Sequence, residues 1–149
     1  MNKTKTKNDL LTVEEMKLIR LDFYPKNAHA FCGIAVNDDH TRIDFYYRSP
    51  YKYVNGGWIT MEPSSYIQVV GSEVKYPLIG ADNIPLAPER HYFRHSGEHH
   101  YYSLFFPPIP KNTKKIHIIE KEAPGNFFNF YGVEVNRGVI KVNETISMN

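Results

Sequence analysis

The chain has 149 residues, 42% of them hydrophobic and 14% aromatic, and its formal net charge at pH 7 is +2. This length suits one domain, which buries about two-thirds of the surface of its unfolded chain. The small net charge argues against a protein dedicated to nucleic-acid binding. No stretch approaches the roughly 18 apolar residues of a transmembrane helix, so we expect no membrane span. The single cysteine, Cys32, excludes an internal disulfide.

The N-terminal segment is polar. Residues 1–12 are rich in lysine and predict a disordered tail. No apolar segment of the kind found in a signal peptide follows residues 1–9, so no signal peptide is visible. Two alternatives follow: a cytoplasmic protein, or a processed or engineered form whose leader has been replaced. Residues 13–20 could form a short helix after a capping box. We prefer a first strand over 17–23, because the segments that follow all have β character.

The next segments predict hairpins. Residues 28–36 form a short apolar run, typical of a buried strand, and residues 41–48 alternate in the manner of a half-buried strand. Asn55-Gly56 predicts a second hairpin over 51–61, because the type I′ turn needs positive φ at both central residues. Residues 66–70 and 73–76 predict another hairpin around a Gly-Ser turn. The proline- and glycine-rich residues 77–98 predict a loop.

A strand over 100–106 precedes a stiff proline segment. We expect Tyr102, Leu104 and Phe106 to form its core face, because side chains alternate along a strand and Ile116 and Ile118 offer a matching face. The prolines at 107, 108 and 110 lack N–H donors and must end the strand. The two strands could pair as a hairpin or cross between two sheets, and the sequence leaves both open.

The remaining elements complete an all-β pattern. Residues 127–135 predict an aromatic strand with a bulge at Gly132, and residues 139–142 predict a last strand. Eight to ten short strands with frequent turns predict an antiparallel β-sandwich. We expect one such domain over residues 13–143, after the tail 1–12.

Six short motifs carry a resemblance to a known family. They are YI at 66–67, KYPLIGADNIPL at 75–86, SGE at 96–98, YSLFFPPIPKNTK at 102–114, IIE at 118–120 and FNFYGV at 128–133. Together, over roughly residues 17–135, the chain resembles an Ig-like β-sandwich domain of gut-anaerobe envelope proteins. That domain often precedes a thioredoxin-like domain, whereas this chain has no C-x-x-C. The resemblance implies an Ig-like antiparallel β-sandwich, a non-catalytic accessory role and a location at the bacterial cell envelope.

Aromatic residues concentrate between residues 46 and 66. Exposed aromatic faces stack on sugar rings or on bases, so this segment predicts a ligand-binding surface formed by Tyr47, Tyr51, Tyr53 and Trp58. The alternative is that most of these rings fill or cover the core. Arg42, Arg48 and Lys52 would suit an anionic ligand or form a solvated face.

Histidines concentrate between residues 91 and 100. Imidazole is a common ligand of divalent metals, so His91, His95 and His99 are candidate metal ligands. No H-E-x-x-H or C-x-x-C pattern accompanies them, and the alternative is a polar loop that holds no cofactor.

Three functions are compatible with these patterns. The first is a non-catalytic binding module for a protein or glycan partner, which the all-β pattern, the aromatic segment and the resemblance favour. The second is a metal-dependent enzyme that uses the loop from His91 to His100. The third is a purely structural or assembly subunit held together by pairing of edge strands.

Overall fold

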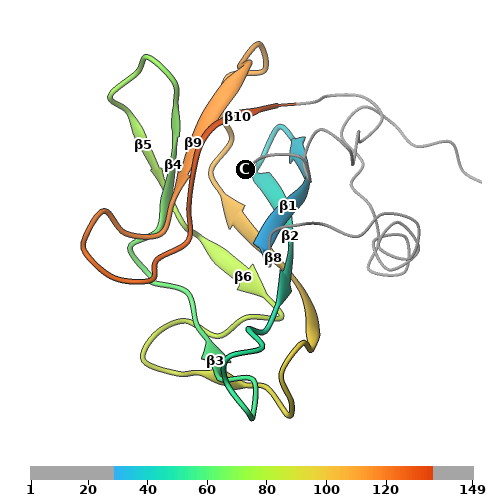
Figure 1. Cartoon of the computed structure of the whole chain (residues 1–149). Coiled ribbons are helices and arrows are strands. Elements are labelled where there is room, and N and C mark those ends of the chain that lie inside the picture. Colours follow the sequence, from blue (N-terminus) through green and yellow to red (C-terminus); the bar gives the residue numbers. More distant parts are fainter. Residues whose placement is uncertain (1–28, 136–149) are drawn as a thin grey trace, which may run out of the picture.

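A computed structural model of the chain describes residues 29–135, which form ten strands and no helix (Figure 1). In this range no helix is therefore long and apolar enough to span a membrane. The predicted tail, the strand over 17–23 and the strand over 139–142 lie outside the described residues. Both ends of the predicted domain, residues 13 and 143, lie outside them too.

The first sheet has four antiparallel strands. Its order is β1 (His29–Val36), β2 (Thr41–Arg48), β8 (His99–Phe106) and β6 (Gly80–Asp82). The hairpin of β1 and β2 is the one that the sequence predicts. The edge strand β6 lies in the segment that the sequence predicts to be a loop, and that prediction is wrong there.

The second sheet also has four antiparallel strands. Its order is β10 (Asn129–Glu134), β9 (Lys115–Ile119), β4 (Tyr66–Val69) and β5 (Lys75–Pro77). The predicted hairpin of β4 and β5 is confirmed. The bulge in β10 is confirmed as well, because Gly132 has a φ of 65° and the register with β9 shifts between Phe130 and Val133.

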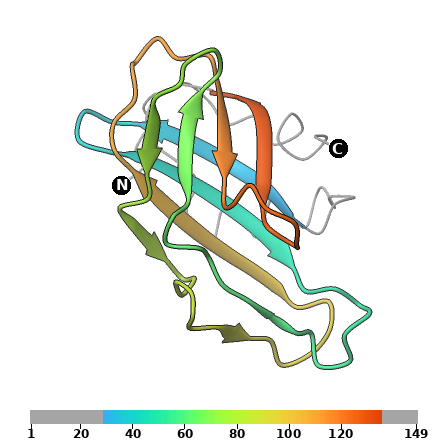
Figure 2. The same ribbon diagram turned by 90° about the vertical axis from the view of Figure 1, so that its left-hand side faces the viewer.

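One core lies between the two sheets, whose strands cross at an angle (Figure 2). The predicted core face of β8 is confirmed, since Tyr102, Leu104 and Phe106 are all buried, as are Ile116 and Ile118 of β9. β8 pairs with β2, whereas β9 pairs with β4. The proline segment therefore carries the chain from one sheet to the other, which decides between the two alternatives.

The predicted hairpin over 51–61 is wrong. A two-stranded sheet forms instead between β3 (Trp58–Ile59) and β7 (His91–Tyr92), 30 residues or more along the chain. Gly56 and Gly57 do have positive φ angles, 82° and 72°, as a tight turn requires. The strand partner nevertheless comes from β7, and the carbonyl of Gly57 accepts a hydrogen bond from the N–H of Phe93 (3.0 Å). The pairing of β3 with β7, which is distant in the sequence, has therefore prevailed over the local turn signal.

The central strands of the first sheet are buried on both faces. On the face away from the core, Asp44, Tyr46 and Tyr101 are buried. The Asp44 carboxylate accepts hydrogen bonds from Ser103 Oγ (2.5 Å) and Arg42 Nε (2.9 Å). Burial raises the pKa of Asp44, and these two donors oppose the rise. Tyr46 lies on this face of the sheet, whereas the next residue, Tyr47, faces the core.

His29 is half-buried in an aromatic cluster that packs against the core. Its Nε2 is 2.6 Å from the hydroxyl of Tyr102, and its ring centroid is 4.2 Å from that of Phe128 and 5.3 Å from that of Tyr47. Burial among these rings disfavours the charged imidazolium and lowers the pKa of His29 from 6.5 to about 3. The neutral ring thus supports two aromatic residues that line the groove described below.

Leu104→Ala tests the assignment of the core. Leu104 is buried between the sheets, so we expect the variant to lose about 2–5 kcal/mol of unfolding free energy in chemical denaturation. Leu86→Ala is the matched control, because Leu86 is 37% exposed and its truncation removes less buried area. Equal losses in the two variants would contradict the assignment.

A second prediction concerns acid stability. Because the pKa of His29 is lowered, the unfolded chain binds a proton below pH 6.5 that the folded protein does not bind until about pH 3. Stability is therefore complete above pH 6.5 and is lost as the pH falls through this window. We expect the melting temperature of His29→Gln to depend less steeply on pH between 7.5 and 5 than that of wild type. His95→Gln, at an exposed site, should keep the wild-type slope.

Candidate functional site

A groove of about 600 Å³ runs between two loops that are far apart in the sequence. The first wall comprises residues 50–62, which contain the β2–β3 loop and β3, and the second wall comprises residues 126–128, just before β10. Figure 2 shows the β9–β10 connection (orange to red) close to the end of β2. Three of the four predicted ligand-binding residues line this groove, namely Tyr47, Tyr53 and Trp58.

Tyr47 forms a fixed part of the groove floor. It is buried, and its ring stacks on Phe93 with centroids 5.8 Å apart and contacts Phe128 at 5.4 Å. Burial raises the pKa of its hydroxyl, so Tyr47 remains un-ionised at neutral pH. This residue partly fills the core, as the alternative interpretation of the sequence expected, and also lines the groove.

Tyr53 and Trp58 present exposed rings, each 45% accessible. Tyr53 packs over Gly57, where an added Cβ would lie 3.1 Å from the ring. Lys52 Nζ lies 5.2 Å from the centroid of the Tyr53 ring, and the guanidinium carbon of Arg90 lies 4.0 Å from that of Trp58. Such cation–π contacts contribute about 0.5–1 kcal/mol at exposed sites and restrain the ring planes.

Tyr51, the fourth predicted residue, does not line the groove. It is 65% exposed and lies beside Gly97, with the guanidinium carbon of Arg48 5.1 Å from its ring centroid. The structure therefore brings together three of the four aromatic candidates and places Tyr51 outside the lining.

The second wall adds residues that the sequence did not single out. Phe127, Phe128 and Asn126 line the groove opposite the tyrosines, and Lys121 Nζ lies 5.3 Å from the Phe127 ring centroid. A turn with Pro124 and Gly125 precedes two adjacent aromatic residues, which is a recognisable local signal. Their position in the same groove as Trp58 depends on how the two sheets pack, and no local pattern encodes that.

A buried carboxylate lies at the base of both walls. Glu120 is only 4% exposed, yet it lines the groove together with Glu62. Its Oε1 accepts a hydrogen bond from the N–H of Phe128 (2.7 Å), and its Oε2 accepts one from the N–H of Glu62 (3.1 Å). Burial raises the pKa of Glu120 and the Glu62 carboxylate adds to the rise, whereas the two backbone donors lower it.

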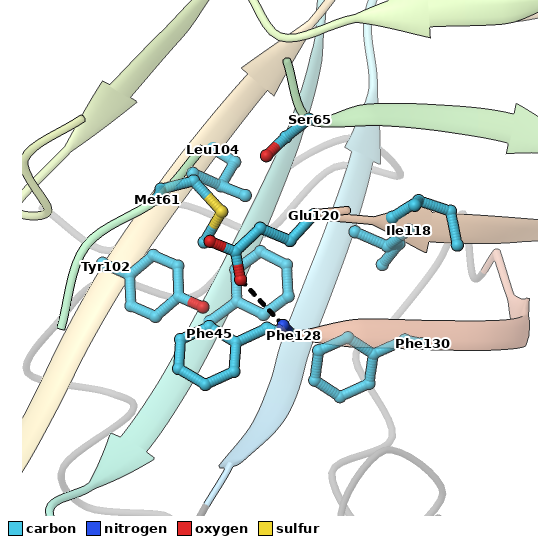
Figure 3. A pocket seen from close by; sticks show the side chains of 10 residues that line it. Phe45, Met61, Ser65, Tyr102, Leu104, Ile118, Glu120, Phe128 and Phe130 are labelled. Atoms are coloured by element: carbon cyan, nitrogen blue, oxygen red, sulfur yellow. Dashed lines mark hydrogen bonds between the residues drawn. The ribbon is translucent and has the colours of Figure 1, made fainter. Parts of the chain in front are cut away.

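Behind Glu120 the core contains a small cavity of about 10 Å³, shown in Figure 3. The Glu120 carboxylate points between Met61, Tyr102 and Phe128, with the side chain of Phe45 nearby. This volume is about that of one water molecule, so the cavity is too small for an organic ligand. The open groove is the larger site.

The three histidines predicted to bind metal lie in different environments. His91 packs against His100, with ring centroids 4.4 Å apart, whereas His95 is exposed and contacts the carbonyl of Ser96. His99 Nδ1 is 2.6 Å from the hydroxyl of Tyr46. Within residues 29–135, no group of three or more His, Cys, Asp or Glu side chains is placed to hold a metal ion. The metal site stays a prediction.

The groove combines apolar ring surfaces with a few polar groups, the usual composition of a small-molecule site. The carboxylate of Glu62 and the amide of Asn126 supply hydrogen-bonding atoms, and Lys52 supplies a positive charge. Comparisons with protein-family models, with curated proteins and with solved structures each gave no match for this chain.

Gly56→Ala tests how the first wall is positioned. An added Cβ would overlap the carbonyl oxygen of His95 and come within 2.7 Å of the Cβ of Phe93, so we expect the β2–β3 loop to be displaced. Gly71→Ala is the matched control, because Gly71 has a similar φ of 90° but no atom within 4 Å of the added Cβ. The control should lose about 1–2 kcal/mol from backbone strain alone, and Gly56→Ala should lose more in denaturant unfolding. Equal losses would show that the contact with the 93–95 segment does not position the loop.

Proposed function

We propose that this protein is a non-catalytic binding module that takes a carbohydrate in the groove between residues 50–62 and 126–128. The observation that carries the proposal is the convergence of Tyr53 and Trp58 with Phe127, from opposite walls, around one open groove. The volume of about 600 Å³ lies within the range of small-ligand sites and would hold a short oligosaccharide segment.

The chemistry of the walls supports a sugar ligand. A sugar ring has an apolar C–H face, which packs against an aromatic ring, and hydroxyl groups, which need hydrogen-bond partners. Trp58 and Tyr53 are accessible and restrained, so stacking on them costs little side-chain entropy. The carboxylate of Glu62 and the amide of Asn126 accept and donate hydrogen bonds at the same groove.

A protein partner is the second candidate occupant. Val54 and Tyr51, at the tip of the β2–β3 loop, are both exposed and extend the aromatic surface beyond the groove. Exposed apolar side chains next to a groove favour docking of another protein.

The proposed Ig-like fold and the proposed cellular location are both based on the resemblance to envelope proteins. Its longest motifs correspond to β5 and β6, to β8 with the proline segment, and to β10. We assign the two sheets to an Ig-like sandwich on that basis, and the chain to an accessory role at a bacterial cell envelope. The antiparallel pairing of both sheets supports the assignment.

Trp58 provides the test, because it is the only tryptophan in the chain and lies in the groove. A glycan array would select soluble oligosaccharides, and these would be titrated while the Trp58 emission is recorded. We expect saturable binding with a shift in emission. Trp58→Ala should weaken binding on the array at least tenfold, which corresponds to about 1.4 kcal/mol of lost stacking.

Tyr131→Ala is the control for this experiment. Tyr131 is an exposed aromatic residue on β10 and does not line the groove. The control variant should bind as wild type does. An array without a specific glycan, or equal binding by both variants, would contradict the proposed ligand.

A further inference from the structure

We infer that Glu120 is a positioning residue that sets the separation of the two groove walls. Its carboxylate is hydrogen-bonded to one backbone amide of each wall, that of Glu62 in the first and that of Phe128 in the second. The inference rests on the proposed function, since it concerns the site that would hold the ligand. If Glu120 sets this separation, protonation of its carboxylate changes the shape of the groove.

Glu120 is itself held in place. Its own N–H and that of Lys121 donate to Oδ1 of Asn129, at 2.9 and 3.2 Å, and the Asn129 amide nitrogen donates to the carbonyl of Lys121 (3.1 Å). These bonds close the β9–β10 connection at its base. The Glu120 carboxylate thus starts from a fixed point and bonds to both walls from the buried side.

Ionisation of Glu120 decides whether both walls are held. An ionised carboxylate accepts hydrogen bonds at both oxygens, whereas the protonated acid has one oxygen that has become a donor. That oxygen no longer accepts well from a backbone N–H, so one of the two walls is released. Burial raises the pKa of Glu120, so release begins above the ordinary value of 4.5.

The charged and titratable groups around Glu120 come from several elements. Glu62 of the first wall disfavours its ionised form, and Lys121 of the β9–β10 connection favours it. Lys52 lies along the same groove, and the neutral ring of His29 packs against Phe128 from the core side. Of these groups, the structure identifies Glu62 and Lys121 as the ones that shift the pKa of Glu120.

A positioning role differs from a merely structural one because protonation then changes the groove without unfolding the protein. Because the pKa of Glu120 is raised by folding, the folded protein binds this proton more tightly than the unfolded chain does. The contribution of Glu120 to stability therefore increases as the pH falls through the interval between its raised pKa and 4.5. The expected signature is a groove that opens while the protein remains folded.

The test follows the backbone amides of Glu62 and Phe128 by NMR in the full chain from pH 7.5 to below 4.5, together with acrylamide quenching of Trp58. We expect both amide shifts to titrate with one midpoint above 4.5, and quenching to increase with the same midpoint. In Glu120→Gln the two titrations should be lost, and Trp58 should already be more accessible at pH 7.5.

Glu62→Gln is the matched variant, because only the backbone of Glu62 bonds to Glu120. It should keep both hydrogen bonds and lower the common midpoint, since it removes the charge that raises the pKa of Glu120. Amides that titrate separately or not at all, or wild-type quenching in Glu120→Gln, would overturn the inference. Should Glu120→Gln fail to fold, the wild-type titration and the midpoint shift in Glu62→Gln decide the question. No sugar is used, so this result is independent of any failure to find a glycan.

Discussion

The pairing of β2 with β8 is the constraint on which the rest of the structure depends. Eight consecutive residue pairs join the two strands, from Thr41 with Phe106 to Arg48 with His99. The paired residues are 51 to 65 positions apart in the sequence, so this pairing closes a large loop and fixes the direction in which each chain segment leaves the sheet. The β2–β3 loop leaves from one end of the pair, and the proline segment that leads to the second sheet leaves from the other. The groove lies at the first end because its floor, Tyr47, belongs to β2.

Local patterns predicted the elements whose partners are close in the sequence. The β1–β2 and β4–β5 hairpins, the core face of β8 and the bulge at Gly132 all depend on alternation and turn chemistry within about 20 residues. The strands β6 and β7 were missed, because two or three residues at the edge of a sheet show no periodicity. The Asn55-Gly56 turn shows the opposite failure. Its local signal is strong, but the backbone that follows it pairs with β7.

Only the residues of the first wall and the floor of the candidate site could be predicted from the sequence. Tyr47, Tyr53 and Trp58 are close in the sequence, and their residue types identified them. Phe127 and Glu120 join them through the packing of one sheet on the other, which the sequence patterns do not express. The position of Glu120 in the sequence does give one indication, since a carboxylate directly after the buried strand β9 needs hydrogen-bond donors. What it binds, two amides from separate loops, became visible only in three dimensions.

The proline segment between the two sheets also limits how this domain can associate with other chains. Extended backbone that offers a row of unpaired N–H groups can recruit a strand from a neighbouring molecule, which is a route to aggregation. Pro107, Pro108 and Pro110 have no N–H to offer. The point at which β8 ends is therefore a poor template for a foreign strand, although it leads from the first sheet to the second. At high concentration the protein would gain colloidal stability from three residues that take no part in either sheet.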